Sequence, residues 1–108
     1  MATLPAHATV QDLQRYVRQM TQERGFSSNS VLQECLLLTE EVGELSKAVR
    51  KQEQLRVDEH SKVGTIAEEL ADILIVLTAI ANHYEVDLER AFRDKEAVND
   101  QRTWRPAA

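Results

Sequence analysis

Apolar residues recur every three or four positions along most of the chain, which is the spacing of amphipathic helices. Four stretches with this spacing each follow a residue that suits a helix N-cap, namely Thr9, Ser30, Thr65 and Asp87. Only 3 glycines and 2 prolines occur in 108 residues, so the chain has little turn chemistry for a many-stranded β fold. The sequence therefore predicts an all-α fold, a four-helix bundle with short connections.

The cap residues also predict where the helices begin and end. An acidic or amide residue follows Thr9, Ser30 and Thr65 at the capping-box spacing, and Gly25 suits the position just after the first helix. We expect helices over residues 10–24, 31–53, 66–84 and 88–101, with an alternative start of the third near Ser61. The length favours one domain over residues 1–108, with its core at about 10–104.

The excess of acidic residues lies in the middle of the sequence. The chain carries 13 Lys and Arg against 18 Asp and Glu, and residues 34–72 alone carry 5 basic and 10 acidic residues. This balance argues against a general nucleic-acid-binding protein. The middle segment either repels itself in solution or holds cations.

Two predicted helices in this segment each carry a pair of carboxylates beside the apolar stripe. At about 100° per residue, Glu41 and Glu44 lie roughly 80° and 140° from the centre of the stripe on residues 31–53. Glu69 and Asp72 repeat the arrangement on the next helix, at roughly 70° and 130°. If the two flanks face each other, four carboxylates converge at the edge of the core.

A divalent cation would offset the cost of bringing these charges together, because desolvating a carboxylate is expensive. Ligands that are all oxygen favour hard ions such as Mg²⁺ or Mn²⁺. Glu40 and Glu68 precede the two pairs and suit an outer role. The alternative is a solvated acidic face whose helical partners are Lys47, Arg50 and Lys51. A di-iron bundle is disfavoured, because no His stands three residues after a Glu.

The last predicted helix carries polar residues on a stripe that begins as apolar. Leu88 and Phe92 are followed, at the same spacing, by Lys95, Asn99 and Arg102. We expect this stripe to face inward, toward an anion. A phosphate suits both cations, because Arg binds it through two nitrogens and Lys as a point charge. A salt bridge to the acidic helices is the alternative.

These residues also carry a resemblance to a known family. The segment EEVGE at residues 40–44, followed by ELAD at residues 69–72, resembles the EExxE…ExxD signature of the MazG-like nucleotide pyrophosphohydrolases. The C-terminal pattern K-x-x-x-N-x-x-R-x-W, at residues 95–104, fits as well. The similarity spans nearly the whole chain.

The resemblance implies an Mg²⁺-dependent enzyme, with Mn²⁺ as the substitute, that cleaves nucleoside triphosphates to monophosphates and pyrophosphate. It implies that the metal ligands are Glu41, Glu44, Glu69 and Asp72, with Glu40 as a further catalytic residue that orients water or reaches a second ion. It also implies that Lys95, Asn99 and Arg102 bind the nucleotide. The implied role is housecleaning of non-standard nucleotides. One alternative is a pyrophosphohydrolase for a single substrate, such as a deoxypyrimidine triphosphate or phosphoribosyl-ATP, and another is a non-catalytic nucleotide-binding or regulatory module.

Two further residues have a sequence-based assignment. Phe26, in the loop after the first helix, suits stacking on a nucleotide base or anchoring that loop between helices. Cys35 lies on an apolar stripe and is expected to pack in the core. A single cysteine fits a reducing compartment, and the N-terminus shows no signal-peptide pattern, so we expect a cytoplasmic protein.

The longest apolar run, residues 73–81, predicts self-association. It is far shorter than the roughly 20 residues that span a bilayer, so no membrane partner is expected. Ala71 and Ile75 lie well away from the stripe of this helix, and a helix that is apolar all round must be covered all round. We therefore expect a homo-oligomer, which the resemblance also implies as a dimer or a pair of dimers.

Overall fold

Four helices and their connections make up the described part of the chain, which holds no strand. The computed structural model describes residues 1–104 and 106. In chain order the helices are α1 (Val10–Glu23), α2 (Val31–Gln52), α3 (Ile66–His83) and α4 (Leu88–Asn99). The predicted all-α fold class is confirmed.

Each helix begins where its cap residue predicts. The side chains of Thr9, Ser30 and Thr65 each accept a hydrogen bond from the backbone N–H three residues on, and that residue's side chain accepts the cap's own N–H in return. The Asp87 side chain caps α4 in the same way, but without the reciprocal bond. The alternative start near Ser61 is not adopted, and α4 ends two residues before the predicted end.

Three helices end on a residue in the left-handed conformation. These residues are Gly25 (φ 76°), Gln54 (φ 59°) and Glu85 (φ 53°). In each case this residue and the next donate their N–H groups back to carbonyls of the last turn, which is the Schellman arrangement. The sequence predicts this conformation only at Gly25, because glycine adopts it without steric cost. Gln54 and Glu85 are residue types that do not indicate it.

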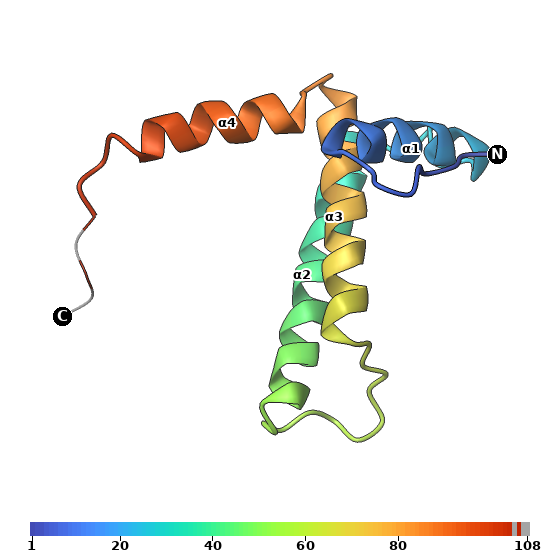
Figure 1. Cartoon of the computed structure of the whole chain (residues 1–108). Helices are drawn as coiled ribbons and strands as arrows, with labels where there is room; N and C mark the ends of the chain where they lie inside the picture. Colours follow the sequence, from blue (N-terminus) through green and yellow to red (C-terminus); the bar gives the residue numbers. More distant parts are fainter. Residues whose placement is uncertain (105, 107–108) are drawn as a thin grey trace.

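The α2 and α3 helices lie side by side and antiparallel, and α1 crosses one end of the pair (Figure 1). The buried Gln14 of α1 holds the turn between α3 and α4. Its side-chain amide donates to the Val86 carbonyl at 2.7 Å and to Asn82 Oδ1 at 3.2 Å. Its side-chain oxygen accepts the N–H of Leu88, the first residue of α4, at 3.0 Å. These bonds fix the point at which α4 leaves the other helices.

The α4 helix extends away from α2 and α3 (Figure 1). None of its residues is buried, and Phe92 is 71% exposed. The prediction that its stripe faces inward is therefore wrong within one chain. Instead Phe92 and Leu88 line an open apolar groove with Leu74 and Leu77 of α3.

The stripes by which α2 and α3 touch are not the ones predicted. On α2 the buried or half-buried stripe includes Glu34, Glu41 and Ala48, whereas Val42 and Val49 stay more than 40% exposed. Cys35, predicted to pack in the core, is exposed and free. The contact face of α2 lies roughly 80° round the helix from the centre of the predicted stripe, so Glu34 and Glu41 enter the contact while Val42 stays outside.

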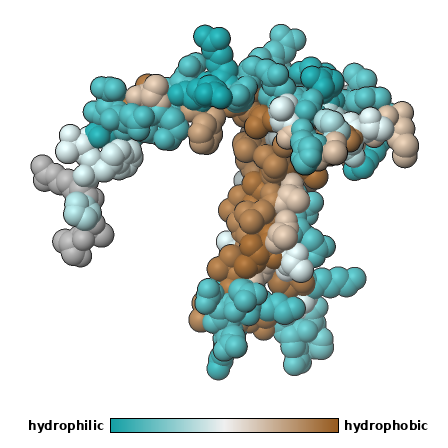
Figure 2. Space-filling view, in the orientation of Figure 1, coloured by the Kyte–Doolittle hydropathy of each residue, from teal (hydrophilic) through white to brown (hydrophobic). Residues whose placement is uncertain are grey.

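The chain on its own buries little apolar surface. The buried apolar side chains are those of Val17, Met20, Ala48 and Ala81, and apolar residues cover an open face of the α2–α3 pair (Figure 2). The radius of gyration is 16.8 Å, against about 13 Å for a compact domain of this length. The accessible surface is 8753 Å², against about 6,100 Å² for a compact monomer of this mass.

Among the described residues, no helix is long and apolar enough to cross a membrane.

Candidate metal centre

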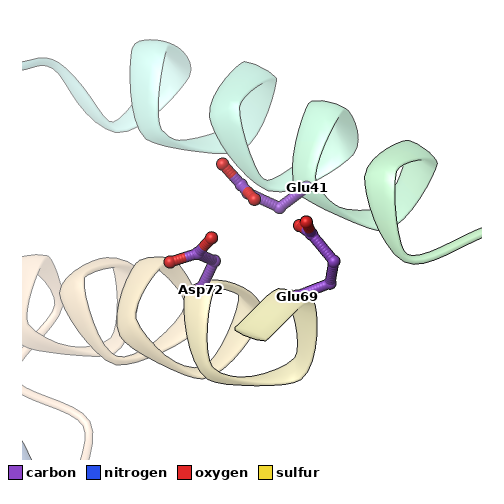
Figure 3. Close-up of side chains that lie close together, drawn as sticks. All are labelled: Glu41, Glu69 and Asp72. Atoms are coloured by element: carbon purple, nitrogen blue, oxygen red, sulfur yellow. The ribbon is translucent and has the colours of Figure 1, made fainter. Parts of the chain in front are cut away.

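Three carboxylates meet where α2 and α3 pack against each other. Glu41 comes from α2, and Glu69 and Asp72 come from α3 (Figure 3). One oxygen of each residue lies within 4.8 Å of the oxygens of the other two. Glu69 is buried, Glu41 is half-buried and Asp72 is exposed, so the cluster opens to solvent on the side of Asp72.

The first turn of α3 positions Glu69. Thr65 caps this turn, and the Glu68 side chain accepts the Thr65 N–H at 3.1 Å, so Glu68 is committed to the cap. Gly64 lies against the Glu69 carboxylate so closely that a Cβ at this position would overlap Glu69 Oε1. The absence of a side chain at Gly64 therefore makes room for the Glu69 carboxylate to reach the cluster.

The electrostatics of the cluster disfavour three free carboxylates. Burial raises the pKa of Glu41, and the charges of Asp72 and Glu69 raise it further. Burial likewise raises the pKa of Glu69, followed by the charges of Asp72 and Glu44. Within residues 1–104 and 106, no Lys, Arg or His forms an ion pair with any of the three. No cationic side chain of the described residues therefore offsets the repulsion between these carboxylates.

The other predicted acidic residues lie around the cluster. Glu44 is close enough to raise the pKa of Glu69, but it stands outside the group of three and its oxygen lies 3.9 Å from Lys47 Nζ. Glu40 is exposed beside Glu41. Among the described residues, the Lys47 contact is the one ion pair that supports the alternative of a solvated acidic face. Arg50 donates instead to the Arg56 carbonyl.

The donor set of the cluster fits a hard divalent cation. All three groups offer carboxylate oxygens, which favour Mg²⁺ or Mn²⁺ over softer metals. Burial is the first cause of the raised pKa values of Glu41 and Glu69, and the second is the negative charge of their neighbours, which a bound cation would offset. The residues present can therefore hold a metal ion.

The nucleotide-binding residues predicted on the last helix do not reach this cluster within one chain. Lys95 and Arg102 are exposed, and the Asn99 side chain donates to Glu96 of the same helix at 3.0 Å. Phe26, in contrast, borders a cavity that also includes Asp72. Glu34, at the start of α2, is buried, and the sequence does not predict this. Its position is that of an ordinary carboxylate in the first turn of a helix.

Fold and site together define an all-α protein with an acidic centre suited to a divalent cation. A sequence profile of the MazG nucleotide pyrophosphohydrolase domain matches residues 29–99, and the chain belongs to this family. No curated protein sequence matches the chain closely enough to indicate common ancestry.

Solved structures agree with this assignment. The crystal structure of YPJD from Bacillus subtilis, provisionally described as a pyrophosphatase, has a TM-score of 0.77 and 26% identity, covering 92% of this chain and 100% of that one. Two structures of iMazG from Vibrio DAT 722 have TM-scores of 0.60 and 0.61 at 30% identity. They cover 85% and 90% of this chain and 98% and 99% of their own.

Proposed function

We propose that this protein is an Mg²⁺-dependent nucleoside triphosphate pyrophosphohydrolase, in which Mn²⁺ can replace Mg²⁺. The observation that carries the proposal is the convergence of Glu41, Glu69 and Asp72 in a member of the MazG family. The products would be a nucleoside monophosphate and pyrophosphate. Housecleaning of non-standard nucleotides in the cytoplasm is the proposed role, and the free thiol of Cys35 is compatible with a reducing compartment.

The acidic residues have separate tasks in this proposal. Glu41, Glu69 and Asp72 would hold the cation, and Glu44 would join them from the next turn of α2 by leaving its contact with Lys47. Glu40 would orient the attacking water from the exposed edge. A bound Mg²⁺ supplies charge neutralisation and a more acidic water, which phosphoryl transfer needs more than covalent chemistry.

A second copy of the chain completes the proposed enzyme. The surface in excess of a compact monomer is on the order of 2,500 Å² per chain, which suits an obligate interface. The open groove between α3 and α4, lined by Leu74, Leu77 and Phe92, suits a helix of the partner. Lys95, Asn99 and Arg102 would then bind phosphates at the partner's acidic centre, since they do not reach their own.

Pyrophosphate release from a panel of common and modified ribo- and deoxynucleoside triphosphates tests the proposed activity. We expect release with Mg²⁺ or Mn²⁺ and none after EDTA treatment, with one monophosphate formed per pyrophosphate. Release of single phosphates instead, or metal-independent turnover, would contradict the proposed reaction. Absence of turnover across the panel, with nucleotide binding retained, would favour a non-catalytic module.

A further inference from the structure

Glu34 is a buried carboxylate that the acidic centre does not use. It lies in the first turn of α2 and is 6% exposed. One oxygen accepts a hydrogen bond from the Asn29 side-chain amide, at 3.3 Å. Within the described part of the chain, no cationic side chain forms an ion pair with it. Burial of a carboxylate without a charged partner is costly, so the position calls for an explanation.

The second oxygen of Glu34 is open to a cavity. It has no hydrogen bond from a described residue, yet no fully enclosed side-chain oxygen or nitrogen of these residues lacks a partner. This oxygen therefore keeps accessible surface, and Glu34 lines the wall of two neighbouring cavities. A free acceptor in such a place can receive an N–H group from a ligand.

One of these cavities connects Glu34 with the acidic centre. It measures about 230 Å³ and lies between α1, the loop after it, α2 and α3. Its wall includes Glu34 and Asn29, which are joined by a hydrogen bond, and also Phe26 and Asp72. The aromatic ring offers a stacking surface, the amide and carboxylate offer polar contacts, and the centre offers a place for phosphates. These are the groups that a nucleotide needs.

We propose that Glu34, oriented by Asn29, selects nucleotides whose base carries an exocyclic amino group. This inference rests on the proposed function, since it assigns the base of the same substrate. The free carboxylate oxygen accepts the amino N–H of the base, as acidic side chains do with the amino group of cytosine. A base with a carbonyl oxygen at that position would place two acceptors against each other and leave both unpaired.

The alternative hypothesis is that Glu34 has only a structural role. A carboxylate in the first turn stabilises a helix N-terminus, and its bond to Asn29 holds the preceding loop. In that case replacing Glu34 would change stability and affect all nucleotides equally. Discrimination between bases separates the two readings, because helix stability does not distinguish an amino group from a carbonyl.

The test compares nucleotide pairs in which a carbonyl replaces the exocyclic amino group and the neighbouring ring nitrogen gains a proton: dCTP with dUTP, and dATP with dITP. For the wild-type protein with Mg²⁺ we expect kcat/KM at least about tenfold higher for the amino member of each pair. Glu34→Gln keeps the shape and the bond from Asn29 but can turn an N–H toward the base, so the ratio should fall by about tenfold or invert. Glu59→Gln, which removes the same charge from an exposed loop, should keep the wild-type ratio.

Equal kcat/KM within both wild-type pairs would overturn the assignment, and this comparison needs no variant to fold. A parallel loss for both members in Glu34→Gln would also overturn it in favour of the structural reading. Binding of dCMP and dUMP, followed by calorimetry, requires no turnover. A protein that prefers dCMP but hydrolyses nothing would refute the proposed reaction while supporting the role of Glu34, and equal or absent binding would refute that role.

Discussion

The α2–α3 pair holds its acidic groups inside a packed contact, whereas α4 carries its polar groups into open space. Glu41 and Glu69 lie on the faces by which α2 and α3 contact each other, and both helices belong to one chain. The stripe of α4 that begins at Leu88 and Phe92 borders an open groove shared with Leu74 and Leu77 of α3, and none of its residues is buried.

The difference shows what an amphipathic pattern specifies and what it leaves open. The pattern identifies a helix and an apolar face, but it does not say whether the covering surface belongs to the same chain. For α2 and α3, the connection of residues 53–65, which begins with the Schellman turn at Gln54, brings the covering helix into place. For α4 the bonds of Gln14 direct the helix outward, so its apolar face stays open within one chain.

Removing a central ligand of the α2–α3 contact should have the largest effect. We expect Glu69→Gln to reduce pyrophosphate release by more than the 10–100-fold that loss of an outer metal contact typically costs. The metal-free protein should keep or gain thermal stability, because one of the repelling charges is gone. Steady-state kinetics and thermal melts on the same sample check both statements.

Glu68→Gln is the matched control for that variant. Glutamine also serves at the third position of a capping box, so the cap on α3 should survive and activity should stay near that of wild type. If both substitutions reduced turnover equally, the distinction between the adjacent glutamates, and with it the metal assignment, would be wrong.

A charge placed on α4 should break the proposed assembly. Phe92 is 71% exposed in one chain, so Phe92→Glu should cost less than about 0.5 kcal/mol of stability if the protein works as a monomer. If a partner covers this face, we expect dissociation or insolubility and a severe loss of activity. Light scattering measures the mass of the assembly.

Ala97→Glu is the matched control, because it lies about 140° further round the helix and should leave the assembly intact. A stable, active wild-type monomer would refute the proposal that a partner covers the Phe92 face of α4.

A methyl group at Gly64 should reduce the metal affinity of the α2–α3 centre, with a smaller effect than the substitutions above. The added Cβ would overlap the Glu69 carboxylate, which must shift from its present position to make room. We expect Gly64→Ala to reduce metal affinity by about tenfold. Gly43→Ala meets no atom within 4 Å and should leave metal affinity unchanged. Equal affinities for Gly64→Ala and wild type, measured by calorimetry, would show that Gly64 does not position Glu69.

The smallest expected effect is a pH dependence of the metal-free protein. Folding raises the pKa of Glu41 and Glu69 above the ordinary value of 4.5, so the folded state binds more protons than the unfolded state in the interval above 4.5. Stability should therefore rise as the pH falls from neutral toward 4.5. Glu41→Gln should flatten this rise in thermal melts. A wild-type protein that loses stability over the interval would contradict the electrostatic account.

The helices and most of the acidic centre could be predicted from the sequence. Cap residues such as Thr65 act locally, through bonds to the next turn, and the i, i+3 spacing of Glu69 and Asp72 keeps both on one side of a helix. Glu41 was placed on the flank of its helix, but it lies within the contact itself. The contact face of α2 lies roughly 80° from the predicted stripe, because periodicity identifies an apolar face but not the side of the helix that meets α3. The same difference explains why Cys35 is exposed.

Features that depend on tertiary placement were not predictable. The direction of α4 depends on three hydrogen bonds of Gln14, whose partners stand about seventy positions away in sequence. Glu34 looks like an ordinary helix-start carboxylate until the loop and α3 enclose it. No spacing rule signals either feature, since both arise from contacts between distant segments.

Direct measurement of Mn²⁺ binding by electron paramagnetic resonance tests the central claim that α2 and α3 hold a divalent cation. The account predicts that wild-type protein binds Mn²⁺ and that Mg²⁺ displaces it. Affinity should fall at least about tenfold in Glu41→Gln and Glu69→Gln, and it should be unchanged in Glu68→Gln. Binding of equal strength in wild type and Glu69→Gln would contradict the claim, because the cation would then lie elsewhere.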